Sequence, residues 1–519
     1  MKKLAVILVG LAMACNSSQK AVPDKTVAEQ PKVGPVSFAG TITEAELKEH
    51  LYVYASDEYQ GRETGEPGQK MASEYIKKEY LSIGVPAAKS DGDYYQNVPL
   101  EARKMPSGTV IFNEVAYELG QDVLAFSKAE GSFEDIVYAG YGIEDSNYSD
   151  YENLDVQDKL VLVKFGEPKN PDGTYVVSGT NESSNWSNIS DAFGKRSKVI
   201  MDKGGLGILY LDGANYSRYK SYFKRMKKRA SNNLSIKADN ADFINILLNE
   251  STATALYPEI INSSDPKLIN ADIKLNLTTE NNTINSENVV AMVKGSTLPN
   301  EYIIISAHLD HIGVTDKGEI NNGADDDGSG TVALLEIAEA FKQASQAGHG
   351  PKRSIVFLHV TGEEKGLLGS QYYTDNEPIF PLAQTVANLN IDMIGRIDPK
   401  REGGRNYIYL IGSDKLSTDL HELSENVNRK YTNLELDYKY NDENDPNRFY
   451  YRSDHYNFAK NNIPIIFYFN GTHDDYHRPS DTPDKINYDL LENRTRLIFH
   501  TAWEIANRDQ KVVVDKATK

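Results

Sequence analysis

Residues 302–311 read Tyr-Ile-Ile-Ile-Ser-Ala-His-Leu-Asp-His, an apolar run that leads directly into two histidines and an aspartate. An apolar run this short predicts a strand buried on both faces, which is typical of a parallel sheet covered by helices. In open α/β sheets, functional side chains gather where the strands end. His308, Asp310 and His311 therefore stand at the edge of the predicted sheet where a site is expected.

The same arrangement recurs at three further predicted strands, residues 353–360, 385–391 and 463–469. The potential ligands that follow them are, in chain order, Glu363 and Glu364, then Asp392, then His473 and His477. A helix is predicted over residues 330–341, with Ser329 as its N-cap, and a closing helix over 490–506. Strands that alternate with helices predict an α/β fold with a mostly parallel, mixed central sheet flanked by helices.

Two other regions differ from this pattern. Residues 41–83 have apolar side chains at helical spacing. Residues 132–256 have short β runs, a predicted helix at 241–248 and no cluster of ligand residues, which indicates an inserted, mainly β domain. The predicted division is a signal at 1–15, a linker at 16–40, the first part of the main domain at 41–130, the insert at 131–262, the main catalytic part at 263–510 and a tail at 511–519.

The composition narrows the class of protein. The chain has 519 residues, of which 39% are hydrophobic and 25% charged, and this length predicts more than one core. Its net charge of -19 argues against nucleic acid as a partner, because phosphate binding needs clustered lysine and arginine. The single cysteine, Cys15, excludes an intrachain disulfide.

The first residues have the pattern of an export signal. Lys2 and Lys3 precede an apolar run, residues 4–14, that is too short to cross a bilayer. Residues 11–15 resemble a bacterial lipoprotein processing site, in which Cys15 takes the lipid, although Ala12 stands where a larger aliphatic residue is usual. Residues 12–14 also fit an ordinary small-x-small cleavage site. We expect an exported protein, either a lipoprotein of the periplasm or outer membrane or a secreted one.

Because histidines and carboxylates follow several of the predicted strands, a metal site is the best interpretation of these residues. A lone strand-end aspartate usually makes a turn or a cap, and the Asp325-Asp326-Asp327 stretch alone also fits a calcium loop. Several histidines and carboxylates at one sheet edge are harder to explain, because clustered carboxylates repel one another without a cation. Imidazole and carboxylate ligands without thiolate favour zinc, and their number suffices for two ions that share one bridge.

As a set, these stretches resemble the M28 family of co-catalytic zinc peptidases. The resemblance covers about residues 288–507 and the N-terminal helical part. It rests on the order and context of His308-x-Asp310, the sequence Gly-Ala-Asp-Asp-Asp at 323–327, Glu363-Glu364, Asp392 and His477. It implies the zinc exopeptidase (phosphorylase/hydrolase-like) fold and peptide substrates. In residues 138–142 and 159–164, the inserted block resembles a protease-associated (PA) domain.

The resemblance also implies a role for each matching position. Asp326 would bridge two zinc ions, with His308 and Asp392 completing one and Glu364 and His477 the other. Asp310 would accept a hydrogen bond from His308 and fix its tautomer. Glu363 would be the general base. A tyrosine often assists the oxyanion in this family, and Tyr450 and Tyr476 are both candidates here.

The remaining histidines fit structural roles better. His359 lies inside an apolar strand, His455 follows an aspartate at a predicted helix start, and His311 does not match a ligand position of the family. His473 is the main rival of His477, which is preferred because residues 477–482 fit the family pattern.

Four interpretations remain open at this point. An aminopeptidase is favoured; a carboxypeptidase is the main alternative, because Arg448 and Arg452 could hold a substrate carboxylate. A glutaminyl cyclase would keep a single zinc, and a non-catalytic scaffold would not need Glu363. The sequence leaves the side-chain preference and the oligomeric state undetermined.

Overall fold

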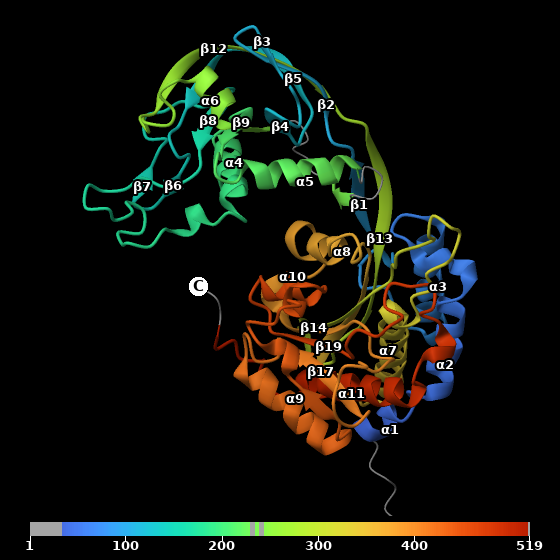
Figure 1. Cartoon of the computed structure of the whole chain (residues 1–519). Coiled ribbons are helices and arrows are strands. Elements are labelled where there is room, and N and C mark those ends of the chain that lie inside the picture. The colour runs from blue at the N-terminus through green and yellow to red at the C-terminus, as the bar shows by residue number, and fades with distance from the viewer. Residues whose placement is uncertain (1–33, 229–233, 238–242, 517–519) are drawn as a thin grey trace, which may run out of the picture.

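The computed structural model describes residues 34–228, 234–237 and 243–516, and in it the chain builds two large sheets. The predicted export signal and most of the linker lie outside these residues. No helix in the described part of the chain is long and apolar enough to span a membrane. Figure 1 shows one sheet with its helices in the lower half and the second arching above it.

The lower sheet has nine strands. In spatial order they are β10 (Leu234–Ile236), β1 (Tyr95–Arg103), β13 (Asn281–Val293), β15 (Arg353–Val360), β14 (Leu298–His308), β16 (Thr385–Ile391), β19 (Ile465–Phe469), β17 (Tyr407–Ile411) and β18 (Glu435–Asp437). The central neighbours β15, β14, β16 and β19 are parallel, whereas β1, β10, β13 and β17 add antiparallel pairings. The predicted mixed α/β sheet is confirmed.

Helices cover both faces of this sheet because its strands are apolar on both faces. Along β14, Ile303 and Ile305 enter one core, while Tyr302 and Ile304 enter the core on the opposite face. Six helices pack into the first core: α1 (Pro35–Ala39), α2 (Glu44–Tyr54), α3 (Pro67–Ile83), α7 (Gly330–Gln346), α9 (Thr418–Tyr431) and α11 (Tyr488–Asn507). The shorter α8 (Leu368–Gln371) and α10 (His455–Ala459) lie against the second face.

The upper sheet has eight strands. Their spatial order is β3 (Val115–Tyr117), β2 (Ser107–Phe112), β12 (Lys267–Thr278), β5 (Ala129–Tyr138), β8 (Leu160–Lys164), β9 (Gly207–Leu211), β11 (Ile244–Leu248) and β4 (Val123–Ala125). Three helices belong to it, α4 (Ala192–Asp202), α5 (Tyr216–Lys228) and α6 (Glu250–Leu256), and β6 (Glu144–Asp145) pairs with β7 (Tyr148–Ser149) beside it. This sheet has hydrophobic cores of its own.

One prediction about these elements is wrong, and two others differ from the structure in detail. The upper sheet uses residues 107–278, beyond the predicted insert boundaries of 131 and 262, because β2 and β12 pair within it. The helix predicted at 241–248 is wrong in its described part, because residues 244–248 form the strand β11, and five residues are too few for periodicity to separate strand from helix. Ser329 stands at the predicted N-cap position of α7, but its side chain makes no capping hydrogen bond; its hydroxyl donates to the carbonyl of Asp325 and accepts from the amide of Ile394.

Candidate metal centre

The predicted ligands converge because the strands that carry them are neighbours. His308 ends β14, and the loops after β15, β16 and β19 supply Glu364, Asp392 and His477. Since these four strands are parallel, their carboxyl ends meet at one edge of the sheet. Asp326 reaches the same place from the loop before α7. Two groups of potential metal ligands result, His308 with Asp326 and Asp392, and His311 with Asp326 and Glu364.

The first group surrounds the Nε2 atom of His308. This atom lies 3.2 Å from Oδ1 of Asp326 and 3.7 Å from Oδ1 of Asp392. All three residues are buried. The Nδ1 atom of His308 is 3.0 Å from the backbone carbonyl of Asp310, and this hydrogen bond leaves Nε2 free to face an ion.

The second group uses the other oxygen of Asp326. His477 Nε2 lies 3.0 Å from Oδ2 of Asp326 and 3.1 Å from Oε2 of Glu364. His311 Nδ1 lies 2.9 Å from Oε1 of Glu364, so the structure brings to the site a histidine to which the sequence analysis gave no ligand role. Asp326 thus presents one oxygen to each group, as a bridging carboxylate does.

The donor atoms are better explained as ligands of metal ions than as hydrogen-bond partners of one another. His308 Nε2, Asp326 Oδ2 and Glu364 Oε1 are buried and have no hydrogen-bond partner among the residues that the structure describes. Buried polar atoms without partners are rare in folded proteins and point to an ion or water. Imidazole nitrogen and carboxylate oxygen without thiolate are the donors of catalytic zinc sites. The residues therefore fit zinc, and Asp326 is placed to serve two ions.

The aspartates on either side of Asp326 have a different task. The two oxygens of Asp327 accept from the amides of Gly330, Met393 and His308. Asp325 Oδ1 accepts from the amide of Gly395 at 2.6 Å. Both carboxylates are thus used to join the loop to neighbouring elements, which leaves the middle aspartate of the triplet as the ligand.

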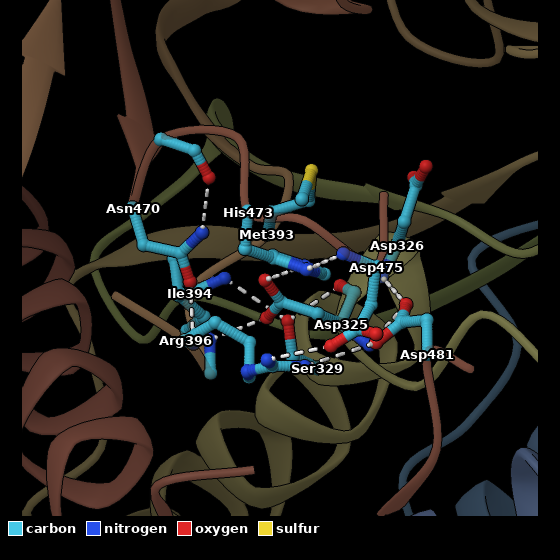
Figure 2. A network of polar contacts seen from close by, with 12 residues as sticks. Asp325, Asp326, Ser329, Met393, Ile394, Arg396, Asn470, His473, Asp475 and Asp481 are labelled. Atoms are coloured by element: carbon cyan, nitrogen blue, oxygen red, sulfur yellow. Dashed lines mark hydrogen bonds and ion pairs between the residues drawn. The ribbon is translucent and has the colours of Figure 1, made fainter. Parts of the chain in front are cut away.

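A second buried carboxylate, Asp481, fixes the backbone of Asp326. Its Oδ2 accepts from the amides of Asp325 at 3.0 Å and Asp326 at 3.2 Å. Figure 2 shows this contact within a wider network, in which His473 Nε2 lies 3.2 Å from Asp325 Oδ2 and Arg396 approaches Asp481 at 3.8 Å. His473, the predicted rival of His477, therefore faces this network and belongs to neither ligand group.

Glu363 lies beside the ligands and is poised to hold a proton. It lines a cavity of about 30 Å³ together with Asp326 and Asp392. Desolvation, followed by the negative charges of Asp392, Glu364 and Asp454, raises the pKa of Glu363 well above its usual value. A bound cation would oppose this effect, because a nearby positive charge favours the ionised carboxylate.

Asp310 does not have the predicted contact with His308. Its carboxylate oxygen is 3.9 Å from His308 Nδ1, which instead bonds to the Asp310 carbonyl. The carboxylate is used elsewhere, since Oδ2 accepts from the Thr64 hydroxyl at 2.6 Å and Oδ1 from the amide of Glu363 at 3.2 Å. Asp310 thus holds His308 through its backbone and the Glu363 loop through its side chain.

The two candidate tyrosines lie in different places. Tyr476 lines the cavity with Glu363 and stacks on His477, with 3.9 Å between ring centroids. Tyr450 lines a separate cavity with Arg448. Arg452, by contrast, lines the Glu363 cavity and lies over the ring of Phe449. Tyr476 and Arg452 therefore lie at the cavity of Glu363, whereas Tyr450 and Arg448 lie at the other cavity.

His359 and His455 have structural partners, as predicted. His359 is buried and its Nε2 lies 2.7 Å from the hydroxyl of Tyr80. His455 is buried against Phe467, with its Nε2 at the carbonyl of Tyr450. Burial lowers the pKa of each imidazole to about 3, so both are neutral packing residues.

Two imidazole–carboxylate groups that share an aspartate, beside a glutamate at the ends of parallel strands, are the kind of arrangement that metal-dependent hydrolases use. Residues 288–502 match the model of Peptidase family M28.

Curated relatives match over parts of their length. A probable leucine aminopeptidase 2 of Aspergillus oryzae is 35% identical over 136 residues, 26% of this chain and 25% of the relative. Aminopeptidase YwaD of Bacillus subtilis is 26% identical over 244 residues, 44% of this chain and 46% of the relative. A probable glutamate carboxypeptidase LAMP1 of Arabidopsis thaliana is 32% identical over 106 residues, 20% of this chain and 14% of the relative. The chain thus spans less than half the length of these relatives.

Solved structures match over most of the chain at low identity. An aminopeptidase from Aneurinibacillus sp. strain AM-1 is 18% identical, with a TM-score of 0.46, and the match covers 93% of this chain and 99% of that one. The zinc aminopeptidase BSAP from Bacillus subtilis is 16% identical, with a TM-score of 0.45, and the match covers 91% of this chain and 97% of that one.

Proposed function

We propose that this chain is an exopeptidase that uses two zinc ions, and that it removes single residues from the N-terminal ends of peptides. The observation that carries the proposal is the position of Glu363, which lines one cavity with Asp326, the carboxylate shared by the two ligand groups, and with Asp392. A general base must stand next to the atom from which it takes a proton, and Glu363 does so for any water between these ligands.

Glu363, Asp310 and Tyr476 have different roles in the proposed hydrolysis. When bound, the zinc ions acidify the attacking water and polarise the scissile carbonyl. Glu363 accepts the proton of that water and passes it to the leaving amine. Its amide donates to Asp310, which keeps the carboxylate near the ligands. Tyr476 lines the same cavity and can donate its hydroxyl to the oxyanion, because desolvation raises its pKa and keeps it protonated.

The cavity also bears on the first residue of the substrate. Phe449, Phe467 and Phe469 line it and offer an apolar surface to a side chain. Arg452 adds a positive charge at the same place. We therefore infer a preference for apolar N-terminal residues over lysine and arginine, whose charges Arg452 would repel.

The carboxypeptidase alternative has one observation in its favour. Arg452 lines the Glu363 cavity and could hold a substrate carboxylate, and one curated relative is called a glutamate carboxypeptidase. Arg448 does not strengthen it, since it lies on the other cavity with Tyr450. A pair of ligand groups argues against a single-zinc glutaminyl cyclase.

Hydrolysis of aminoacyl-nitroanilides and N-blocked dipeptides by the zinc-loaded protein tests the proposal. We expect release from free-amine substrates, and its loss in Glu363→Gln while two zinc ions stay bound. Cleavage of blocked dipeptides alone, with a KM that rises in Arg452→Gln, would establish the carboxypeptidase instead. No turnover of either class with both ions bound would reject an exopeptidase.

We also propose that the upper sheet is a PA-type domain, which the sequence of residues 138–142 and 159–164 supports.

We propose further that the chain is exported and anchored by lipid on Cys15. The basic and apolar sequence before Cys15 supports this proposal. Labelling with radioactive palmitate in the expressing cell should mark the wild type and spare Cys15→Ser. Equal labelling of the two proteins would reject the anchor.

A further inference from the structure

We propose that His311 is a ligand of the second zinc ion, together with Glu364, His477 and Asp326. This inference rests on the proposed zinc site and adds a fourth protein ligand to one of its two ions. It also makes the two ions unequal, because the described residues offer the first ion three ligands, His308, Asp392 and the shared Asp326.

The contacts of the imidazole ring support coordination. Nδ1 of His311 lies 2.9 Å from Oε1 of Glu364 and 3.8 Å from Oδ2 of Asp326. The side chain is fully buried, and yet neither ring nitrogen makes a hydrogen bond with any described residue. A nitrogen 2.9 Å from a carboxylate oxygen without hydrogen-bond geometry is what two ligands of one ion show, since both point at the ion.

The surroundings fix the ring in this orientation. The amide of His311 donates to the carbonyl of Arg62, and His311 forms a bridge with Glu63. The backbone of Gly323 is so close that a Cβ there would lie 2.6 Å from Cγ and Cδ2 of the imidazole. The ring of His477 meets it edge-on, with 5.7 Å between centroids. The ring is thus held in place without a hydrogen bond to any residue that the structure describes, which leaves Nδ1 available to a metal ion.

A role as a core histidine fits less well. His359 and His455 are buried to the same degree, and each has a partner for Nε2, the hydroxyl of Tyr80 and the carbonyl of Tyr450. In the described part of the chain, His311 has no such partner and two carboxylates within 3.8 Å. An imidazole desolvated in this way needs a compensating contact, which an ion supplies.

Counting the coordinated imidazoles tests the inference directly. In the cobalt-substituted protein, each imidazole bound to the ion gives a strongly shifted, exchangeable N–H proton resonance. We expect three such resonances in the wild type, from His308, His311 and His477, and two in His311→Gln. His421→Gln, which replaces a half-buried histidine outside both groups, should keep all three.

Equilibrium dialysis with zinc provides the second measurement. We expect His311→Gln to hold one of its two ions at least tenfold more weakly, with its circular dichroism unchanged. Two cobalt-shifted resonances in the wild type that both persist in His311→Gln would overturn the assignment even if affinity falls, since loss of a mere positioning contact also weakens metals. A wild type that binds no metal would instead reject the proposed function.

Discussion

Adjacent residues of one type perform different tasks at this site. Asp325, Asp326 and Asp327 are consecutive and buried, but only the middle carboxylate faces both ligand groups. The outer two accept backbone amides, which joins their loop to the ends of other strands. A buried carboxylate that accepts several amides stabilises a loop conformation, whereas one that faces other carboxylates needs a cation.

Asp481 is expected to control metal affinity from outside the ligand set. Asp481→Ala removes the acceptor for the amides of Asp325 and Asp326, so the bridging carboxylate is no longer fixed. We predict a loss of zinc affinity of roughly 10- to 100-fold, as for other partners that orient ligands. Competition with a chromogenic chelator measures it. Asp481→Asn keeps an acceptor oxygen and should retain more affinity, and equal affinity in all three proteins would contradict the role.

Tyr476 and Tyr450 form a matched pair for testing the oxyanion contact. Tyr476→Phe keeps the stacking on His477 and removes only the hydroxyl. Loss of one oxyanion donor costs roughly 100-fold in kcat, and we expect a fall of that order with KM nearly unchanged. Tyr450→Phe, on the separate cavity, should leave kcat within twofold. A larger effect at Tyr450 than at Tyr476 in steady-state assays would reverse the assignment.

At the scale of elements, the central strands were predictable and their surroundings were not. Strands β15 and β16 have the predicted bounds: β15 contains the continuous apolar run 355–358, and β16 is a short, mostly apolar segment that also holds Asn388 and Asn390. Strand β12 alternates buried and exposed residues over its second half and escaped notice, which shortened the predicted insert. Four of the five predicted ligands come together because the strand ends share an edge, and Asp326 joins them from the loop before α7. The ligand-like position of His311 was missed because spacing along the chain does not reveal where a ring points.

Helix α7 carries a buried carboxyl group that should make stability depend on pH. Burial, followed by the charges of Glu46 and Glu339, raises the pKa of Glu336 to about 9, and His50 Nε2 lies 3.5 Å from its Oε1. A folded pKa above the unfolded value near 4.5 means that the fold is favoured by the protonated form. The contribution of protonated Glu336 to stability is complete below about pH 4.5 and is lost as the pH rises toward 9.

Glu336→Gln should therefore change the pH profile in a defined direction. The amide stays neutral, so the variant is expected to gain stability over the wild type as pH rises, on the order of a few kcal/mol at pH 8. Urea unfolding at pH 5 and pH 8, followed by tryptophan fluorescence, measures the difference. A gap between the two proteins that is the same at both pH values would show that Glu336 does not titrate in this range.

The whole molecule consists of two parts with separate cores, and the metal centre belongs to one of them. The lower sheet and the upper sheet bury different sets of apolar side chains, and they are joined where β1 leads into β2 and β12 leads into β13. Both ligand groups lie on the lower sheet. Unfolding is then not expected to be a single two-state event. Metal binding should stabilise the lower part alone.

The two tryptophans allow each part to be followed separately. Trp186 is buried beside the upper sheet and donates to Asp145, whereas Trp503 lies on α11 and stacks on Phe38 and Phe341. In Trp186→Phe only the fluorescence of Trp503 is observed, and in Trp503→Phe only that of Trp186.

A ligand at a thousand times its Kd stabilises the folded state by about 4 kcal/mol. Removal of zinc with a chelator should thus lower the Tm seen by Trp503 by several degrees, and added zinc should restore it. The Tm seen by Trp186 should move by less than one degree, because no ligand group lies among the described residues of that part. An equal fall in both would mean that the two parts unfold as one unit. No fall in either would mean that the carboxylates at the strand ends do not hold a metal ion.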